Sequence, residues 1–418
     1  MKRSIWSTCV HSMAAVALAM MLHGCDSTSS TSPDVRPDAD SLAMSPDSAS
    51  VAVGTTFRFT VVAYDSLGRV INANLRFASS DSAVFTVDGT GRVRGENPGV
   101  ATLTVTSGAA RDSAIVIVTP AIRGWYAQSS GVTGVALHGV FFRPSGSRGW
   151  VVGDGGRILR TLDGGAEWTL QPSGTALALN DTWFTSDLEG WAAGNSGTVL
   201  RTINGGTSWT RLLNTGTGEN LYAVQFVNRD TGWVVGSNGV ILRTIDRGGS
   251  WQRVNPSSFD LHGVSFSGAS DGWAVGDNGV ILGTRNSGQS WYTVVPSVTT
   301  AGLRDVWRAS VSRANAVGAA GAAPRTIAAA DSASWLLDNV GGGYELHGVC
   351  FPTATVGFAV GAGGGGAVLR SDDGGDSWLP QLANTAFPLE DVFFVDTLRG
   401  WAVGANGTIV HTVTGGLP

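Results

Sequence analysis

The chain has 418 residues, of which 43% are hydrophobic and 14% charged, and its formal net charge is −5. A pI near 5.7 argues against broad nucleic-acid binding, which requires a basic surface. Lys2 is the only lysine, so arginine supplies the remaining positive charge, and the low charged fraction predicts a surface of Gly, Ser, Thr and Asn.

The N-terminus has the features of a signal peptide. Lys2 and Arg3 precede an apolar run, residues 14–22, that is too short to cross a bilayer as a helix. The segment Leu-His-Gly-Cys that ends at Cys25 resembles the bacterial lipobox, in which the cysteine is lipidated and becomes the first mature residue. We therefore expect residues 1–24 to form a lipoprotein signal peptide, with ordinary cleavage and a free cysteine as the alternative.

Cysteine usage agrees with this prediction. Cys9 leaves with the signal, Cys25 takes the lipid, and Cys350 stays alone in a predicted strand, so no structural disulfide is expected. Cys350 is then most simply a small buried hydrophobic residue. Residues 25–40 are rich in Ser, Thr, Asp and Pro, a composition that predicts a flexible tether from the membrane.

Residues 41–119 have a different pattern and contain no tryptophan. Short alternating runs, such as 51–59 and 98–105, are separated by turn residues and predict a β-sandwich. These segments resemble the bacterial Ig-like domain of group 2, which occurs in intimins and surface adhesins and also lacks the immunoglobulin cysteine pair. The resemblance implies a spacer rather than a dedicated binding site.

Seven copies of one segment fill residues 125–418. A Gly-Trp pair or its equivalent marks each copy, and these anchors recur at spacings of 40 to 43 residues. They are Gly149-Trp150, Gly190-Trp191, Gly232-Trp233, Gly272-Trp273, Ala314-Asn315, Gly357-Phe358 and Gly400-Trp401. A tandem period of this size indicates a solenoid or a propeller.

One copy predicts four short strands. The second copy runs through 179–184, 190–194 and 197–202 to Trp209, as runs of Val, Leu, Trp, Phe and Thr broken by Gly, Asn and Asp. No stretch has the period or length of an amphipathic helix. Four strands per copy make an antiparallel blade, so we expect an all-β chain: a seven-bladed β-propeller after an N-terminal Ig-like β-sandwich.

The last copy lacks the strand that should carry its tryptophan. The missing strand is at the other end of the repeat region, because residues 125–131 match residues 168–174. We therefore expect residues 125–131 to complete the seventh blade and close the ring.

Each hairpin between the third and fourth strands carries the pattern Ser/Thr-x-Asp-x-Gly-x-x-Trp. The acid position is filled by Asp163, Asn204, Asp246, Asn286 and Asp373. This pattern resembles the Asp-box, or BNR, repeat of sialidase-type propellers, in which the acid accepts turn N–H bonds and the tryptophan packs over the hairpin. We expect a structural role for it. The fifth copy has lost the pattern around Asp331 and has Pro324 in mid-strand, so its blade should be the least stable.

The whole repeat, Gly-Trp-x-Val-Gly-x-x-Gly-x-Ile-Leu-Arg-Thr-x-Asp-Gly-Gly-x-x-Trp, resembles the propellers of the photosystem II assembly and stability factors and their non-photosynthetic bacterial relatives. The resemblance covers residues 125–418. It implies a non-enzymatic propeller that holds a protein partner during assembly.

An arginine ends the third strand in five copies, and these arginines are candidates for binding a partner: Arg160, Arg201, Arg243, Arg325 and Arg370. The assembly factors that the chain resembles carry arginine at matching positions. The alternative is structural pairing with acids of the loops between the first and second strands, such as Glu189, Asp230, Asp271 and Asp396.

A second set follows the leading leucine of each first strand and varies while its neighbours repeat. We therefore predict a ligand-facing ring at the mouth of the central channel: His138, Asn180, Tyr222, His262, Arg304, His347 and Glu390. The three histidines belong to copies one, four and six, too far apart around the ring to share a metal ion, so we expect no metal and no cofactor.

The sequence lacks the motifs that are typical of several enzyme classes. The Arg-Ile-Pro start motif of sialidases is absent, as are a nucleophile elbow, a P-loop and a Cys/His metal motif. We expect a monomeric, extracytoplasmic lipoprotein of the cell envelope whose propeller binds a protein partner without catalysis. The alternative is a carbohydrate-binding or glycoside-hydrolase-like propeller at the cell surface, for which paired carboxylates must lie at a suitable distance.

Overall fold

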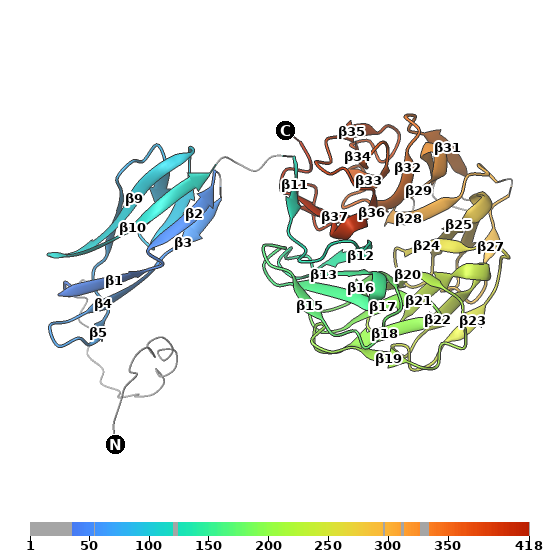
Figure 1. The fold of residues 1–418 in the computed structure, drawn as a ribbon, viewed down its shortest axis with the longest axis horizontal. Helices are drawn as coiled ribbons and strands as arrows, with labels where there is room; N and C mark the ends of the chain where they lie inside the picture. Colours follow the sequence, from blue (N-terminus) through green and yellow to red (C-terminus); the bar gives the residue numbers. More distant parts are fainter. Residues whose placement is uncertain are drawn as a thin grey trace, which may run out of the picture. The chain divides into compact units, whose positions relative to one another are not determined.

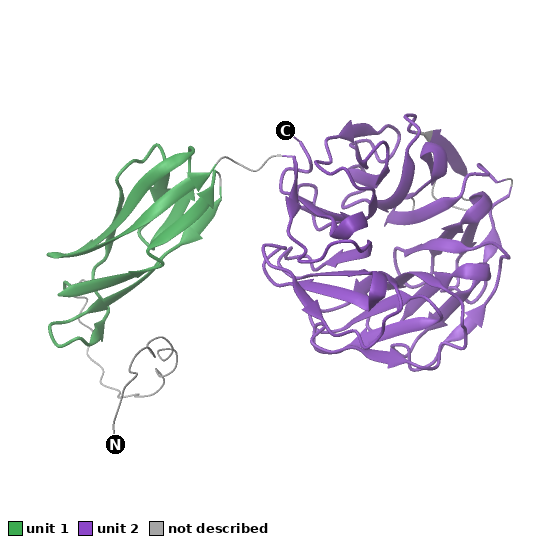
Figure 2. Cartoon of the chain, in the orientation of Figure 1, with its two compact units in different colours: residues 1–121 green, residues 122–418 purple. Residues whose placement is uncertain are grey.

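The computed structural model describes residues 36–53, 55–119, 124–295, 297–310, 313–326 and 334–417. The chain forms two compact units, residues 1–121 and residues 122–418 (Figure 2). The predicted signal peptide, Cys25 and residues 25–35 of the predicted tether lie outside the described residues. Within the described ranges, no helix has both the length and the apolar character needed to cross a membrane.

The first unit consists of short strands in three sheets, with the orders β2-β10-β9-β6, β1-β4-β5 and β3-β8-β7. Along β10 the residues alternate, so Val116 is buried while Ile115 and Ile117 are exposed, as a sheet with one covered face requires. Phe85 and Leu103 are fully buried in the core between the sheets. The strands are β1 (Ser41–Ser45), β2 (Ser48–Ala52), β3 (Thr56–Arg58), β4 (Thr60–Tyr64), β5 (Val70–Ile71), β6 (Arg76–Ser79), β7 (Phe85–Val87), β8 (Arg92–Gly95), β9 (Gly99–Ser107) and β10 (Ala110–Thr119).

The second unit is a ring of seven four-stranded antiparallel blades (Figure 1). The expected all-β, seven-bladed propeller is confirmed. Blade 1 holds β12 (Leu137–Phe142), β13 (Gly149–Gly153), β14 (Arg157–Thr161) and β15 (Thr169–Gln171); blade 2 holds β16 (Leu179–Phe184), β17 (Gly190–Gly194), β18 (Thr198–Thr202) and β19 (Thr210–Leu212). Blade 3 holds β20 (Leu221–Phe226), β21 (Gly232–Gly236), β22 (Ile241–Thr244) and β23 (Gln252–Val254); blade 4 holds β24 (Leu261–Phe266), β25 (Gly272–Gly276), β26 (Ile281–Thr284) and β27 (Tyr292–Thr293).

The remaining blades follow the same order from the channel outward. Blade 5 holds β28 (Leu303–Ser310), β29 (Arg313–Gly318), β30 (Ala322–Thr326) and β31 (Trp335–Asn339); blade 6 holds β32 (Glu345–Cys350), β33 (Gly357–Ala362), β34 (Gly366–Ser371) and β35 (Leu379–Gln381). Blade 7 holds β36 (Leu389–Phe394), β37 (Gly400–Gly404), β38 (Ile409–Thr412) and, from the start of the unit, β11 (Trp125–Gln128).

Strand β11 is the outer strand of blade 7. It pairs antiparallel with β38, from Trp125 opposite Thr412 to Gln128 opposite Ile409, and Figure 1 shows it beside the red C-terminal strands. Trp125 is fully buried, and its indole N–H donates to Gln381 Oε1 at 3.0 Å. The two ends of the propeller are thus held together by a sheet rather than by a loop.

The repeated Gly-Trp pair sits where neighbouring blades meet. In six blades the glycine lies against the phenylalanine that ends the first strand, so that a Cβ at Gly149, for example, would collide with the ring of Phe142. In blades 1, 2, 3 and 7 the tryptophan then stacks on the equivalent phenylalanine of the next blade, as Trp191 does on Phe226 at 3.7 Å between ring centroids, and Phe358 does the same in blade 6. These five anchors therefore each serve two blades.

The boundary between blades 4 and 5 lacks this stack. Arg308 stands where the other blades have phenylalanine, and Ala314 stands where they have glycine. Trp273 instead meets Trp335 edge-on, at 5.2 Å between centroids. The lost Asp box of blade 5, around Asp331, lies outside the described residues.

The propeller has two ends. The Asp-box face carries the loops between first and second strands and the Asp-box hairpins, such as 161–168. The turn face carries the connections between second and third strands, five of which form the 3₁₀ turns η1 (Asp154–Gly156), η2 (Ser237–Gly239), η3 (Asp277–Gly279), η4 (Ala319–Gly321) and η5 (Ala405–Gly407). Left-handed residues such as Asn238, with φ of 53°, shape these turns, as the Gly- and Asn-rich sequence predicts.

Candidate functional site

The central channel is lined by the first strand of each blade. A β-bulge breaks the register after the leading residue of these strands, for example between Leu179 and Asp181. The strands bring three layers of side chains to the channel, from their second, third and fifth positions. Each layer has its own chemistry.

The second-position layer is the ring predicted from the sequence. Six of its residues line one cavity of about 120 Å³ at the turn face: His138, Asn180, Tyr222, His262, Arg304 and Glu390. His347 is the seventh, and its Nδ1 lies 3.2 Å from Glu390 Oε2. Most of the ring is tied to the turn face, since His138 Nε2 lies 2.9 Å from Asp154 Oδ1 and His262 Nε2 lies 2.9 Å from Asp277 Oδ1. The structure brings these residues together, and their role as ligand contacts stays a prediction.

Two of the histidines differ in proton affinity. Burial and the neighbouring Arg304 lower the pKa of His262. The hydrogen bond with Glu390 raises the pKa of His347, and the same bond lowers the pKa of Glu390. The charge at the mouth of the channel therefore depends on which neighbours each imidazole has.

The third-position layer holds three carboxylates that the sequence analysis did not single out: Asp181, Asp305 and Asp391, the channel aspartates. Each accepts a backbone N–H from the next blade, from Val224 at 2.7 Å, Val349 at 2.9 Å and Val140 at 2.8 Å respectively. Protein surrounds these carboxylates, although the channel leaves them part of their accessible surface. Burial raises the pKa of Asp181 and of Asp305 to about 7, and burial followed by repulsion from the other two raises the pKa of Asp391 well above its usual value.

The fifth-position layer is aromatic in four of the seven blades. Four aromatic residues form what we call the aromatic cluster: Phe141, Trp183, Trp307 and Phe393. Phe141 contacts Trp183 and Phe393 at ring-centroid distances of 5.0 and 4.8 Å, and Trp307 contacts Phe393 at 6.1 Å. Trp183, Trp307 and Phe393 also line the small cavity at the turn face, so the cluster lies between the two cavities.

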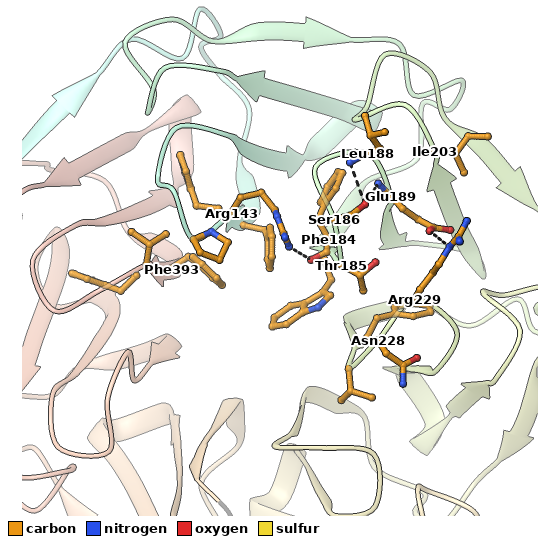
Figure 3. A pocket seen from close by; sticks show the side chains of 18 of the residues that line it. Arg143, Phe184, Thr185, Ser186, Leu188, Glu189, Ile203, Asn228, Arg229 and Phe393 are labelled. Atoms are coloured by element: carbon orange, nitrogen blue, oxygen red, sulfur yellow. Dashed lines mark hydrogen bonds and ion pairs between the residues drawn. The ribbon is translucent and has the colours of Figure 1, made fainter. Parts of the chain in front are cut away.

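A larger cavity, of about 730 Å³, opens above the cluster at the Asp-box face. We call it the aromatic cavity. The aromatic cluster forms its floor, and the loops after the first strands of blades 1, 2, 3 and 7 form its wall. Figure 3 shows Arg143, Leu188, Glu189 and Arg229 around it. Its size is that of a typical ligand pocket.

Three charged residues line the aromatic cavity, Arg143, Glu189 and Arg229, and ion pairs join them to charged residues beside it. Asp187 pairs with Arg143 at 3.3 Å and with Arg148 at 3.5 Å. On the other side, Glu189 pairs with Arg229 at 2.7 Å and with Arg201. Each carboxylate is shared by two guanidinium groups.

The five predicted partner-binding arginines all make contacts within the propeller. Arg160, Arg243 and Arg370 donate to backbone carbonyls of the following Asp-box hairpin, those of Gly205, Ser287 and Gly415. Arg325 pairs with Asp338 at 2.6 Å and with Asp376 of the next blade at 3.2 Å. Of the five, only Arg201 pairs with an acid of a loop between first and second strands, namely Glu189. The expected pairing with the other loop acids is wrong, because the long side chains reach the adjacent hairpin instead.

The Asp-box residues stabilise their own hairpins. Asp373 Oδ1 accepts from Ser371 Oγ at 2.8 Å and from the Ser377 N–H at 2.9 Å. Partial burial opposes ionisation, but these hydrogen bonds prevail and lower the pKa of Asp373 to about 2. Equivalent bonds are formed by Asp163, Asn204, Asp246 and Asn286.

Cys350 is fully buried in blade 6, and its Sγ accepts the Phe394 N–H at 3.4 Å. Burial raises the pKa of this thiol. Across the part of the chain that the structure describes, no group of three or more His, Cys, Asp or Glu residues has an arrangement suited to a metal ion.

Comparisons with known proteins give a consistent picture. Residues 120–215 and 212–343 match the family model described as photosynthesis system II assembly factor YCF48, and residues 38–118 match that of the bacterial Ig-like domain (group 2). The two propeller matches together cover more than half of the chain. No curated protein matches the chain.

Many solved structures resemble the propeller, including the following three. One, YCF48 bound to D1 peptide, is 22% identical with a TM-score of 0.60, and the match covers 70% of this chain and 98% of that one. YCF48 from Cyanidioschyzon merolae is 22% identical with a TM-score of 0.58, covering 69% and 98%. Virginiamycin B lyase from Staphylococcus aureus is 12% identical with a TM-score of 0.60, covering 69% and 98%. At these identities the likeness concerns the fold.

Proposed function

Because the chain belongs to the photosystem II assembly factor YCF48 family, we propose that its propeller binds a protein partner as a scaffold or assembly factor, without catalysing a reaction. One observation carries the proposal: the aromatic cluster forms the floor of a cavity of about 730 Å³ at the Asp-box face. A relative of known structure, YCF48, has been solved with a bound D1 peptide, which supports a polypeptide as the class of partner.

The arrangement of carboxylates supports binding over catalysis. Glu189 is the one carboxylate among the described residues that line the aromatic cavity, and two arginines neutralise it. The clustered carboxylates are the channel aspartates and Glu390, which line the small cavity on the other side of the aromatic cluster. A glycosidase needs paired carboxylates beside the sugar, so we place the carbohydrate alternative second.

We propose that the protein works outside the cytoplasm, anchored by a lipid on Cys25 and separated from the membrane by residues 26–40 and the Ig-like unit. The lipobox-like segment before Cys25 supports this location. A Cys25→Ser variant should be released as soluble protein or remain as unprocessed precursor. Mature Cys25→Ser protein in the membrane fraction would contradict the anchor.

Affinity purification tests the function. The full chain is purified from the membranes of its own host after reversible chemical cross-linking, and the eluate is analysed by mass spectrometry and by native gel. We expect a stoichiometric complex with an envelope protein and no turnover of polysaccharides or of virginiamycin B. Recovery of the chain alone, together with lyase or hydrolase activity, would reject the proposal.

A further inference from the structure

The floor of the aromatic cavity is apolar, so exposing it to water costs free energy. Phe141, Trp183, Trp307 and Phe393 converge on it, and two aliphatic side chains at its edge, Leu188 and Ile203, are 56% and 67% exposed. Apolar surface of this kind, gathered in one hollow, is typical of an interaction site. An apolar side chain of a partner would displace water from the exposed parts of these side chains.

The wall of the cavity is positive, although the whole chain carries a net charge of −5. Arg143 and Arg148 share Asp187, and Arg201 and Arg229 share Glu189. Two arginines on one carboxylate leave one positive charge on each cluster. The two clusters are both positive and lie on neighbouring loops.

The arginines that a partner meets first differ in their freedom. In the Glu189 cluster the side chain of Arg229 is 59% exposed and that of Glu189 is 7% exposed, so a ligand meets the guanidinium group before the carboxylate beneath it. In the Asp187 cluster the carboxylate is 53% exposed and Arg148 is 41% exposed, so a ligand meets both charges there. A planar guanidinium presents donors that match a carboxylate, so acidic side chains are the complementary group.

We infer that the aromatic cavity binds a polypeptide segment in which an apolar side chain, aromatic or large aliphatic, lies between acidic residues. The inference rests on the proposed function and names the chemistry of the partner at this face. The apolar side chain packs on the aromatic cluster, and the flanking carboxylates meet Arg229 and the Arg143–Arg148 pair. A basic segment is disfavoured by the same two clusters.

A random peptide library displayed on phage, selected against the full chain, identifies the preferred chemistry. We expect a consensus of one or two large apolar residues flanked by Asp or Glu, and binding of the synthetic consensus peptide should weaken with added salt. A basic consensus, or no enrichment over an unrelated protein, would overturn the inference.

Variants locate the binding site of that peptide. Trp183→Leu at the floor should weaken binding about tenfold or more, as expected for a buried aromatic contact. Arg229→Ala should weaken it about threefold to fivefold, as for a partly exposed ion pair. Arg253→Ala, an exposed arginine of blade 3 away from the cavity, should leave the affinity unchanged. Thermal melts check that each variant folds, and the exposed Leu188→Ser replaces Trp183→Leu if the latter unfolds.

A charge reversal gives the sharpest result. Arg229→Glu should lose affinity for the acidic peptide and regain it for a peptide in which the facing acid is lysine. Equal affinity of wild type, Arg229→Glu and Leu188→Ser for the same peptide would overturn the site. If a partner were still cross-linked elsewhere on the propeller, the proposed function would stand while this assignment failed.

Discussion

The indole of Trp150 stacks on the ring of Phe184 across the boundary between blades 1 and 2, with centroids 3.6 Å apart and planes at 12°. The same indole donates its N–H to the Gly205 carbonyl of the neighbouring Asp-box hairpin at 3.0 Å. One residue thus joins the core of one blade to the edge of the next.

Removing this tryptophan should cost more than removing its counterpart in blade 4. Trp150→Ala should lower the free energy of unfolding by about 3–5 kcal/mol, as for other buried tryptophans. Trp273→Ala should cost about 1 kcal/mol less, because Trp273 has edge-on contacts with Trp335 and Tyr292 in place of the stack, while Trp150 also donates a hydrogen bond to Gly205. Denaturant unfolding of the two variants measures the difference, and equal losses would show that the stack and this hydrogen bond together add no more than the edge-on contacts do.

The fifth blade offers a test of the pairing between phenylalanine and glycine. Arg308→Phe alone should destabilise the propeller, because the Cβ of Ala314 occupies the place that the ring needs, as the collisions at Gly149 and Gly190 indicate. Arg308→Phe with Ala314→Gly should recover that loss. Melting temperatures of the two single variants and the double variant give the coupling; simple additivity would contradict the explanation.

The repeat and the closure of the ring could be predicted from the sequence, because they depend on features that nearly every copy shares. Trp125 is recognisable because it completes a truncated copy. The aromatic cluster is different, because its position holds Phe141, Trp183, Gln225, Ser265, Trp307, Cys350 and Phe393 and has no repeating signal. The channel aspartates could not be predicted either, because the β-bulge breaks the alternation of side chains along the strand. The pattern then does not tell which of two adjacent residues points into the channel. The second position was selected because its residue varies between copies while its neighbours repeat. The same criterion, applied to the fifth position, would have identified the aromatic cluster.

Closure of the ring should dominate the stability of the propeller. Deleting residues 125–131 removes the strand paired with β38 and the buried Trp125, and it exposes a strand edge. Burial of a tryptophan alone contributes about 3 kcal/mol or more, against a total of about 5–15 kcal/mol. We expect an aggregating or molten protein, whereas deletion of residues 26–119 should leave a cooperative melt. A normal transition without residues 125–131 would mean that β11 is dispensable.

The channel aspartates should make stability depend on pH. The pKa of Asp305 is raised from 3.8 to about 7 by burial, so folding favours its protonated form. Its contribution to stability is therefore fully present below about pH 4 and is lost as the pH rises through 7. Asp305→Asn imitates the protonated acid, so its stability relative to wild type should be higher at pH 8 than at pH 5. This difference in the free energy of unfolding should be about 1–2 kcal/mol, because water in the channel screens the charge of Asp305 and reduces the effect.

The comparison reports Asp305 together with its coupling to the other channel aspartates. Titration of His262 occurs in both proteins and largely cancels in the difference, whereas removing the Asp305 charge also relieves the repulsion that raises the pKa of Asp181 and of Asp391. Asp230→Asn, on the exposed loop where Asp230 pairs with Arg247, is the matched control, and its offset from wild type should not change with pH. An Asp305→Asn offset that is equally constant would contradict the assignment.

Site-specific photo-cross-linking tests the central claim most directly. A photoreactive phenylalanine analogue replaces either Ile203, an exposed residue lining the aromatic cavity, or Phe259, a 44% exposed residue at the turn face. After irradiation of intact cells, we predict a discrete adduct with one envelope protein from position 203, absent from position 259 and lost on adding Arg229→Glu. Adducts from position 259 alone, or from neither position, would contradict a protein partner bound over the aromatic cavity at the Asp-box face.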